Sequence, residues 1–466
     1  MQRRTLQHQR YDVVVIGGGS AGVAASISAA RNGARTLLID AGPTIGGELL
    51  SGLPLNACLS ARGEWVVGGV VRELLERCDA MGGLVPPYFD WRALWLVCVD
   101  PEVMKLACPL MVAEAGVHLL LNTFAEEVIV EDGAVTGLMI ANKSGRSLVT
   151  AGVFIDCSGD GDIAALAGAP FEKGGSKGEL QPVSLVFRMQ GVETAPLLEF
   201  VRTHPEEIAV AENPWIKQTP EECIAEIVKS GLPKVFLKGN GALVSSAVKR
   251  GEMYPTSLVA STPVSLQRKE VSLNTTRVSG IDATDTAKLS NALPGLMDQV
   301  WQCAGFLKKY LPGYENAHFA GLAPRIGIRE TRRIVGEQYL TYDDVKNARK
   351  REDTICKGAH HIDVHGAGQA QLREPIKDGG SFDIPLGCLI PKNTKNLFMA
   401  GRCLSASREA HGAARVMGTC IGMGQAVGTA AGMLVRSGDT SDVRRVDVGD
   451  LQVDLRRQGA ILDGTH

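Results

Sequence analysis

Apolar runs separated by glycine-rich and polar stretches mark the first forty residues as a strand–helix–strand unit. Residues 11–16 are mostly β-branched, as in a buried parallel strand, and lead directly into the glycine turn 17–22. The alanine-rich stretch 21–32 predicts a helix, and the apolar run 35–39 predicts a second strand. The chain therefore opens with a βαβ unit, which requires a parallel sheet.

Later segments carry two other patterns. Residues 127–130, 134–141 and 147–149 alternate like a β-meander, with glycine turns between them, and an apolar strand at 152–156 follows. Residues 178–320 contain less glycine and more charge, and they mix strand-like and helical runs such as 183–189 and 283–310. This change in pattern predicts an inserted α+β domain.

The apolar stretch 416–435 is about long enough to cross a membrane. It contains five glycines, two threonines and Gln425, which suit close packing better than contact with lipid. We therefore expect a buried helix and no transmembrane segment.

Charge and cysteine content exclude several classes of protein. The 466 residues include 49 basic and 51 acidic side chains, a balance that does not favour nucleic acid or an anionic membrane as partner. The 11 cysteines form no C-x-x-C pair, which argues against zinc sites, iron–sulfur clusters and a redox dithiol. The polar start of the chain does not resemble a signal peptide, so we expect a cytoplasmic protein.

The opening unit has the residues that a dinucleotide site needs. Gly17 permits a tight turn, Gly19 lets the backbone approach a pyrophosphate, and Gly22 lets the helix pack on the strand. The amino terminus of the helix directs its N–H groups at the phosphates. Asp40, at the end of the second strand, can accept hydrogen bonds from both ribose hydroxyls. We find no second unit of this kind, so a built-in NAD(P)H domain is not expected.

Four further segments carry a resemblance to known flavoproteins. Gly46-Gly47 resembles the second glycine pair of FAD enzymes, and residues 155–172 resemble the second nucleotide-binding segment of FAD-dependent oxidoreductases related to fumarate reductase flavoproteins. Residues 396–402 resemble the segment that packs against the flavin's ribityl chain. Residues 409–418 are similar to the H-G-x-N-R-x-G-G pattern of fumarate reductases and succinate dehydrogenases, although Ala414 and Met417 depart from it.

The resemblance implies an α/β fold with a Rossmann-like, three-layer FAD-binding domain, which has a parallel central sheet and a β-meander. Its first part is expected at 1–177 and its return, with the active-site segment, at 321–440. An α+β substrate or cap domain is expected at 178–320, and a tail at 441–466. The helix beginning near Thr419 would direct its amino terminus at the flavin's pyrimidine edge.

The motifs and the resemblance together give a set of cofactor-binding candidates. They are Ile16, Gly17, Gly19, Ser20, Ala21, Gly22, Asp40, Ala41, Gly46, Gly47, Glu48, Ser158, Gly159, Asp160, Asp162, Gly401, Arg402, Gly418 and Thr419. Asp160 and Asp162 could alternatively serve only as turn formers or helix caps. Since no histidine lies near Gly46, where relatives attach FAD covalently, we expect non-covalent FAD.

Arginines and histidines of the last third are the candidates for chemistry. Arg325, Arg329 and Arg415 match family positions that face the active site or bind a substrate carboxylate. Arg332 and Arg333 are expected instead to pair with Glu330 and Glu337 on a solvated surface.

The acid or base is expected among three histidines, which are His361, His365 and His411. A structural role for the histidines around residue 362 is an equal alternative, and no metal site is expected because no further ligands complete a set.

These observations predict an FAD-dependent dehydrogenase or reductase that exchanges a hydride between flavin N5 and a small polar substrate bearing a carboxylate. A flavin oxidase or monooxygenase is the first alternative. A flavin subunit that passes electrons to a separate iron–sulfur partner is the second. The sequence leaves open the substrate, the external electron acceptor and the oligomeric state.

Overall fold

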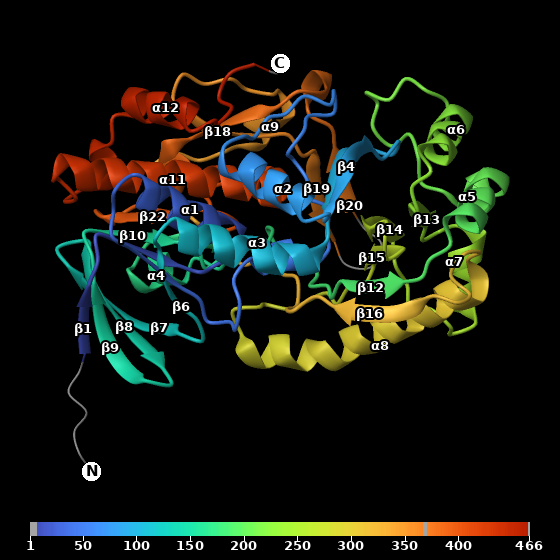
Figure 1. The fold of residues 1–466 in the computed structure, drawn as a ribbon, viewed down its shortest axis with the longest axis horizontal. Helices are drawn as coiled ribbons and strands as arrows, with labels where there is room; N and C mark the ends of the chain where they lie inside the picture. Colours follow the sequence, from blue (N-terminus) through green and yellow to red (C-terminus); the bar gives the residue numbers. More distant parts are fainter. Residues whose placement is uncertain (1–6, 367–370, 465–466) are drawn as a thin grey trace, which may run out of the picture.

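A five-stranded parallel sheet lies at the centre of the predicted nucleotide-binding part of this computed structural model, which describes residues 7–366 and 371–464 (Figure 1). In spatial order its strands are β22 (Leu397–Met399), β10 (Val153–Asp156), β2 (Val13–Ile16), β3 (Thr36–Ile39) and β6 (His118–Leu120). Val15 of β2 lies opposite Ile155 and Leu38. The opening βαβ unit is confirmed, and strands from much later in the chain complete its sheet.

Each face of this sheet is covered by a different layer. Four helices cover one face, namely α1 (Ser20–Arg31), α2 (Val70–Ala80), α3 (Pro101–Glu114) and α11 (Met417–Ser437). The other face carries a four-stranded sheet made of β1 (Gln7–Arg10), β9 (Gly145–Thr150), β8 (Ala134–Asn142) and β7 (Phe124–Glu131). Alternate side chains of β2 point to opposite faces of the sheet. Val13 and Val15 pack toward the helices, and Val14 packs toward the meander. The predicted three-layer α/β architecture is therefore confirmed.

Helices α1 and α11 touch along glycine positions of α11. A Cβ atom built on Gly424 would lie 2.1 Å from the carbonyl oxygen of Ala21, and one on Gly428 would lie 2.2 Å from that of Ala25. Only glycine permits so close an approach, so the small residues of 416–435 serve helix packing. Among the helices in the described part of the chain, α11 included, none is long and apolar enough to span a membrane.

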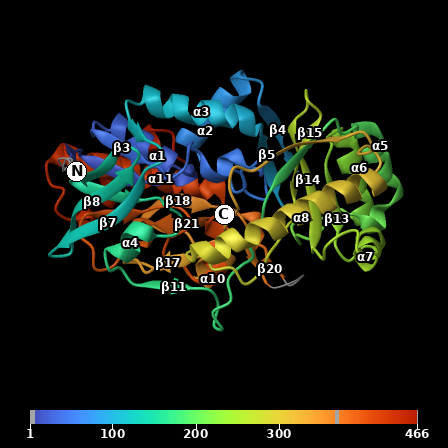
Figure 2. The same cartoon turned by 90° about the horizontal axis from the view of Figure 1, so that it is seen from below.

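A second, antiparallel sheet builds most of the predicted substrate domain. Its strands, in spatial order, are β13 (Val235–Lys238), β14 (Leu258–Ser265), β15 (Glu270–Asn274), β12 (Phe187–Gln190) and β16 (His318–Leu322). The long helix α8 (Thr286–Tyr310) crosses this sheet and packs on one face of it (Figure 2). Three shorter helices join this part, namely α5 (Thr194–Thr203), α6 (Pro220–Ser230) and α7 (Ala242–Lys249). The strand predicted at 183–189 is shorter than expected, because Val183 and Ser184 form only isolated bridges.

The hairpin of β4 (Leu84–Phe89) and β5 (Trp95–Val99) packs against β14 of the antiparallel sheet and against helix α2 of the nucleotide-binding part. The remaining helices and strands belong to the segments 162–173 and 332–457. They are α4 (Asp162–Leu166), β11 (Phe171–Lys173), β17 (Arg332–Ile334), α9 (Tyr342–Lys346), β18 (Thr354–Gly358), β19 (Ile362–His365), β20 (Gln371–Glu374), β21 (Phe382–Pro385), α10 (Arg408–Ala414) and α12 (Val448–Arg457).

Strand β17 carries Arg332 and Arg333, which were predicted to form ion pairs on a solvated surface. Arg333 does pair with Glu330, at 2.5 Å, but both side chains are buried, 5% and 0% exposed, rather than solvated. Arg332 pairs with Asp162, and Glu337 pairs with Arg444 instead. The predicted pairing of Arg333 with Glu330 is therefore correct, but the predicted solvent exposure of this pair is wrong.

Candidate active site

The turn between β2 and α1 has the geometry that the glycine spacing predicts. Gly17 adopts a φ of +99°, and a Cβ on it would lie 2.3 Å from the carbonyl oxygen of Cys157. A Cβ on Gly22 would lie 1.7 Å from the carbonyl oxygen of Gly17. A Cβ on Gly19, the N-cap of α1, would meet nothing within 4 Å. Gly17 and Gly22 are therefore required by packing, whereas Gly19 faces open space where a ligand can approach.

Asp40 is held in place beside this turn. Its Oδ2 accepts a hydrogen bond from the backbone N–H of Gly18 at 2.6 Å, and its Oδ1 accepts one from Gly42 at 2.6 Å. The side chain is buried but still lines the cavity described below. Its orientation at the end of β3 suits hydrogen bonding to a ribose.

Two further glycines line the same groove. Gly47 has a φ of +57°, and a Cβ on it would lie 2.9 Å from the Cα atom of Gly19. Gly159 has a φ of +80°, and a Cβ there would lie 2.9 Å from Nη2 of Arg402. At both positions a side chain would collide with a neighbouring part of the site, so the chain needs glycine there. The open space at Gly19 and the position of Asp40 fit an extended dinucleotide such as FAD.

A cavity of about 390 Å³ extends from this groove to the antiparallel sheet, within the usual range of about 300–1,000 Å³ for ligand sites. Most of the residues predicted from the sequence line it. From the cofactor set these are Gly17, Gly19, Ser20, Ala21, Asp40, Gly47, Glu48, Ser158, Gly159, Asp160, Gly401 and Arg402; from the catalytic set they are Arg325, Arg329, His361, His365 and Arg415. Strand ends, turns and helix starts that lie far apart in the sequence therefore meet at one site.

Eight predicted residues do not line the cavity. They are Ile16, Gly22, Ala41, Gly46, Asp162, Gly418, Thr419 and His411. His411 is fully buried, and its Nε2 lies 2.8 Å from the carbonyl oxygen of Arg402, so this histidine packs behind the wall. Arg325 lines the cavity but lies 4.0 Å from Asp40, at the ribose end and away from the other predicted arginines.

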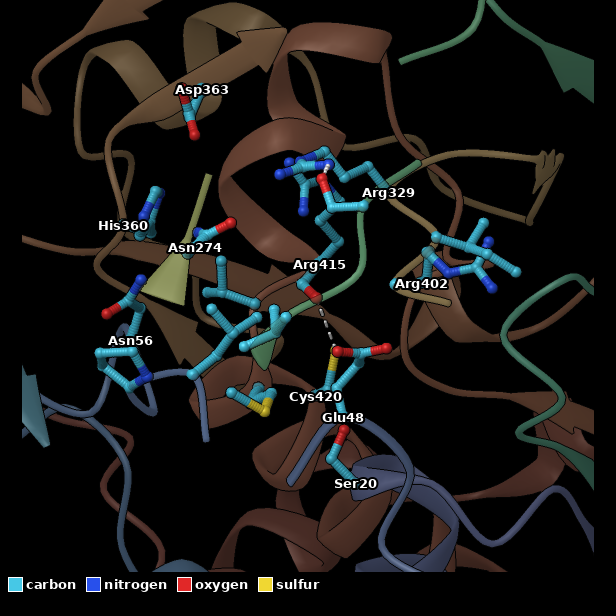
Figure 3. Close-up of a pocket in the computed structure, with 18 of the residues that line it drawn as sticks. Ser20, Glu48, Asn56, Asn274, Arg329, His360, Asp363, Arg402, Arg415 and Cys420 are labelled. Carbon is cyan, nitrogen blue, oxygen red and sulfur yellow. Dashed lines mark hydrogen bonds between the residues drawn. The ribbon is translucent and has the colours of Figure 1, made fainter. Parts of the chain in front are cut away.

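Arg329 and Arg415 lie beside each other in the interior of the site (Figure 3). Nη1 of Arg329 donates to the carbonyl oxygen of Pro182 at 2.8 Å and to Oγ of Ser184 at 2.6 Å. Nη2 of Arg415 donates to Oε1 of Gln181 at 3.3 Å, while its buried Nε has no partner among the described residues. Burial and the charge of Arg415 lower the pKa of Arg329 to about 9, so it still carries its charge at neutral pH.

A histidine–carboxylate pair lies near these arginines. Nε2 of His365 lies 3.0 Å from Oδ2 of Asp363, and Nδ1 of His365 is buried without a partner among the described residues. Burial lowers the pKa of His365 to about 4, so its imidazole is neutral at pH 7. Burial alone would raise the pKa of Asp363, but His365 and its hydrogen bond lower it well below the usual value. The neutral ring therefore donates its Nε2 proton to an ionised carboxylate.

Other histidines of the segment share the neutral state. Burial lowers the pKa of His361 to about 4 and that of its neighbour His360 to about 3. The two rings stack with centroids 4.3 Å apart. A stacked, uncharged pair matches the structural role that the sequence left open for this segment.

Several lining residues were not predicted from the sequence. They come from segments without a motif and include Asn56, Arg92, Asn274, Arg277, Asp363 and Arg373. Asp363 alone had a usable signal, since it lies between two predicted histidines, and it shares strand β19 with His365. The rest are brought to the site by β15, by β20 and by loops whose positions depend on tertiary packing.

Comparison with known proteins places the chain among flavoenzymes. The profile of the family described as "FAD dependent oxidoreductase" matches residues 12–455. The tRNA uridine 5-carboxymethylaminomethyl modification enzyme MnmG of Lactobacillus gasseri is 31% identical over 151 residues, which are 29% of this chain and 22% of that enzyme. The MnmG of Zymomonas mobilis is 27% identical over 198 residues, 39% of this chain and 30% of that enzyme. The match thus spans less than a third of these relatives.

Solved structures with a similar fold are more distant. A geranylgeranyl bacteriochlorophyll reductase-like protein from Thermoplasma acidophilum aligns over 97% of this chain and 84% of its own, with a TM-score of 0.47 and 14% identity. A p-nitrophenol 4-monooxygenase from Pseudomonas putida aligns over 95% and 85%, with a TM-score of 0.45 and 11% identity. The narrower resemblance to the fumarate reductase flavoproteins stays a prediction.

Proposed function

Since this chain belongs to the FAD-dependent oxidoreductases, we propose that it oxidises or reduces a carboxylate-bearing substrate held by Arg329 and Arg415. The bound FAD supplies a hydride acceptor or donor. The observation that carries the proposal is the pair of buried guanidinium groups in the cavity, one of which has a buried N–H without a partner among the described residues. A substrate carboxylate would satisfy that donor and neutralise the local charge.

The groove residues would hold the cofactor. Gly19 leaves room for the pyrophosphate at the start of α1, Gly17 permits the tight turn before it, and Asp40 would accept hydrogen bonds from the ribose. Gly47 and Gly159 line the same groove. We propose non-covalent binding, because no histidine lies near Gly46 in the sequence.

Replacing Gly19 by alanine tests this assignment. The new methyl group meets no protein atom within 4 Å, so the fold should be retained while the methyl group crowds the pyrophosphate. Overpacking costs about 1–3 kcal/mol, which corresponds to a loss of FAD affinity of about 5- to 150-fold. Titration of the apoprotein with FAD measures the loss. The matched control is Gly305→Ala, on the exposed side of α8 with equal free space, which should bind FAD normally. Equal affinity in both variants would contradict the proposed pyrophosphate position.

The proton in this reaction is assigned to His365. With Nε2–H donating to Asp363, the lone pair on Nδ1 remains available. A neutral imidazole held in this orientation can accept a proton from the substrate, so the arrangement favours the oxidation direction, in which the substrate loses a proton and a hydride. His411 receives no such role, since it lies behind the wall against Arg402.

Anaerobic mixing with candidate acids tests the function directly. An acid that is oxidised should bleach the flavin absorbance of the FAD-loaded protein without any other reductant, and the reduced protein should reoxidise slowly in air. A different result would overturn the proposal. If bleaching requires NAD(P)H and is followed by rapid oxygen consumption that an acid stimulates, the chain is a flavin monooxygenase. Both chemistries occur on related folds, so the fold itself does not decide between them.

A further inference from the structure

One wall of the cavity is apolar, and it lies away from the predicted cofactor groove. It is formed by Leu94, Leu96, Phe236, Leu258 and Ala260. These residues belong to the β4–β5 hairpin and to strands β13 and β14, none of which carries a predicted cofactor residue. The wall therefore belongs to the part of the cavity left for the substrate.

The two-residue period of β14 makes this wall. Leu258 and Ala260 face the cavity, whereas Val259 packs into the core beneath α8 and Ser261 hydrogen-bonds the buried Tyr314 at 2.6 Å. The hairpin then packs on the cavity side of the strand, so Leu258 and Ala260 pack against one small apolar cluster with Phe236 and Leu96. The wall is thus a continuous apolar surface formed by the antiparallel sheet and the hairpin.

Polar groups line the same cavity, and one of them lies directly against this wall. Arg92, His361 and Asp363 line the same cavity, and the guanidinium carbon of Arg92 lies 5.6 Å from the ring centre of Phe236. Nε of Arg92 is paired with Glu212 at 2.9 Å, and its buried Nη2 has no partner among the described residues. A molecule in this space therefore meets both apolar side chains and cationic or polar groups.

We propose that the substrate is an amphipathic carboxylic acid, with its carboxylate on Arg329 and Arg415 and an aliphatic or aromatic body against the wall of Leu94, Leu96, Phe236, Leu258 and Ala260. This inference rests on the proposed function for its carboxylate end. A short dicarboxylate would leave the wall facing water and gain nothing from it. An apolar body gains about fourfold in affinity for each methylene group that it buries there.

Calorimetric titration of the FAD-loaded protein with straight-chain monocarboxylates, from acetate to decanoate, tests the inference, with succinate for comparison. Affinity should rise about threefold to fourfold per methylene group and level off when the wall is covered. Octanoate should bind more tightly than succinate. Affinity that is independent of chain length, or tighter binding of succinate, would overturn it.

Two variants of the same strand locate the effect. Ala260→Leu fills part of the cavity, so the affinity should level off at chains about three carbons shorter, the number that leucine adds to alanine. Val259→Ile changes the neighbouring residue on the opposite face and should leave the chain-length series unchanged. Flavin content and thermal unfolding check that both variants are folded. An identical series in Ala260→Leu and the wild type would place the ligand elsewhere.

Alcohols of the same lengths separate this inference from the function on which it depends. If alkanols bind as tightly as the acids and show the same chain-length dependence, the apolar wall is supported but the carboxylate site fails. If acids bind in a manner that depends on Arg415 yet without chain-length dependence, the carboxylate site is supported and the amphipathic substrate is excluded.

Discussion

Replacing Arg415 by glutamine is expected to weaken carboxylate binding to the FAD-loaded protein by about 30- to 5,000-fold. This range corresponds to the roughly 2–5 kcal/mol lost when one partner of a buried, hydrogen-bonded charge pair is removed. The Nε of Arg415 is buried and has no partner among the described residues, so a bound carboxylate would form a direct ion pair with it. Calorimetry with the tightest-binding acid measures the loss.

Arg436→Gln is the matched control for this substitution. Arg436 lies on α11, pairs with Asp454 at 2.8 Å, and does not line the cavity. The control variant should bind the acid as the wild type does. Wild-type affinity in Arg415→Gln would show that the anion binds elsewhere, with Arg92 as the next candidate because its buried Nη2 also has no partner among the described residues.

His365→Gln is expected to lower kcat/KM for oxidation of the acid by about 100- to 10,000-fold, the usual contribution of a positioned general base. Glutamine keeps a hydrogen-bond donor toward Asp363 but has no basic nitrogen. Because burial lowers the pKa of His365 to about 4, wild-type kcat/KM should be independent of this group from about pH 5 upward. The value of kcat/KM should fall as the pH decreases through about 4, because the imidazole then gains a proton and can no longer act as a base.

Asp363→Asn separates the base from the group that orients it. The variant removes the carboxylate that favours protonation of His365, so the acid limb of the pH profile should move to lower pH. His318→Gln, on the exposed edge of β16, should change neither rate nor profile. A wild-type rate in His365→Gln would remove the general base from this position.

The nucleotide-binding half could be predicted because its signals are local. The strand, the glycine turn, the helix and Asp40 occupy thirty consecutive residues, and each residue type has one physical reason for its position. Glycine spacing in 17–22 fixes the close contacts that the structure contains. The runs also indicated a buried parallel strand and a meander, since alternation and length distinguish the two, whereas the three-layer arrangement was implied by the family resemblance.

The substrate half could not be predicted in this way, because its residues share no motif. Leu96, Phe236 and Ala260 are ordinary strand residues that become neighbours only when the hairpin packs against β14. Tertiary packing also determines the position of His411, which was predicted as a candidate acid or base. Its side chain instead contacts the carbonyl oxygen of Arg402, and the rotation of a short helix such as α10 cannot be derived from sequence period alone.

The close contact of α1 with α11 also sets the order of events during synthesis. Helix α1 ends at Arg31 and α11 begins at Met417, so 385 residues lie between them. At about 5–20 residues per second, the ribosome needs roughly 20–80 s to make that stretch. Throughout this time the surface of α1 that contacts α11 is uncovered and the nascent nucleotide-binding unit stays incomplete. Fragments that end before Met417 lack this contact, and we expect them to be prone to aggregation.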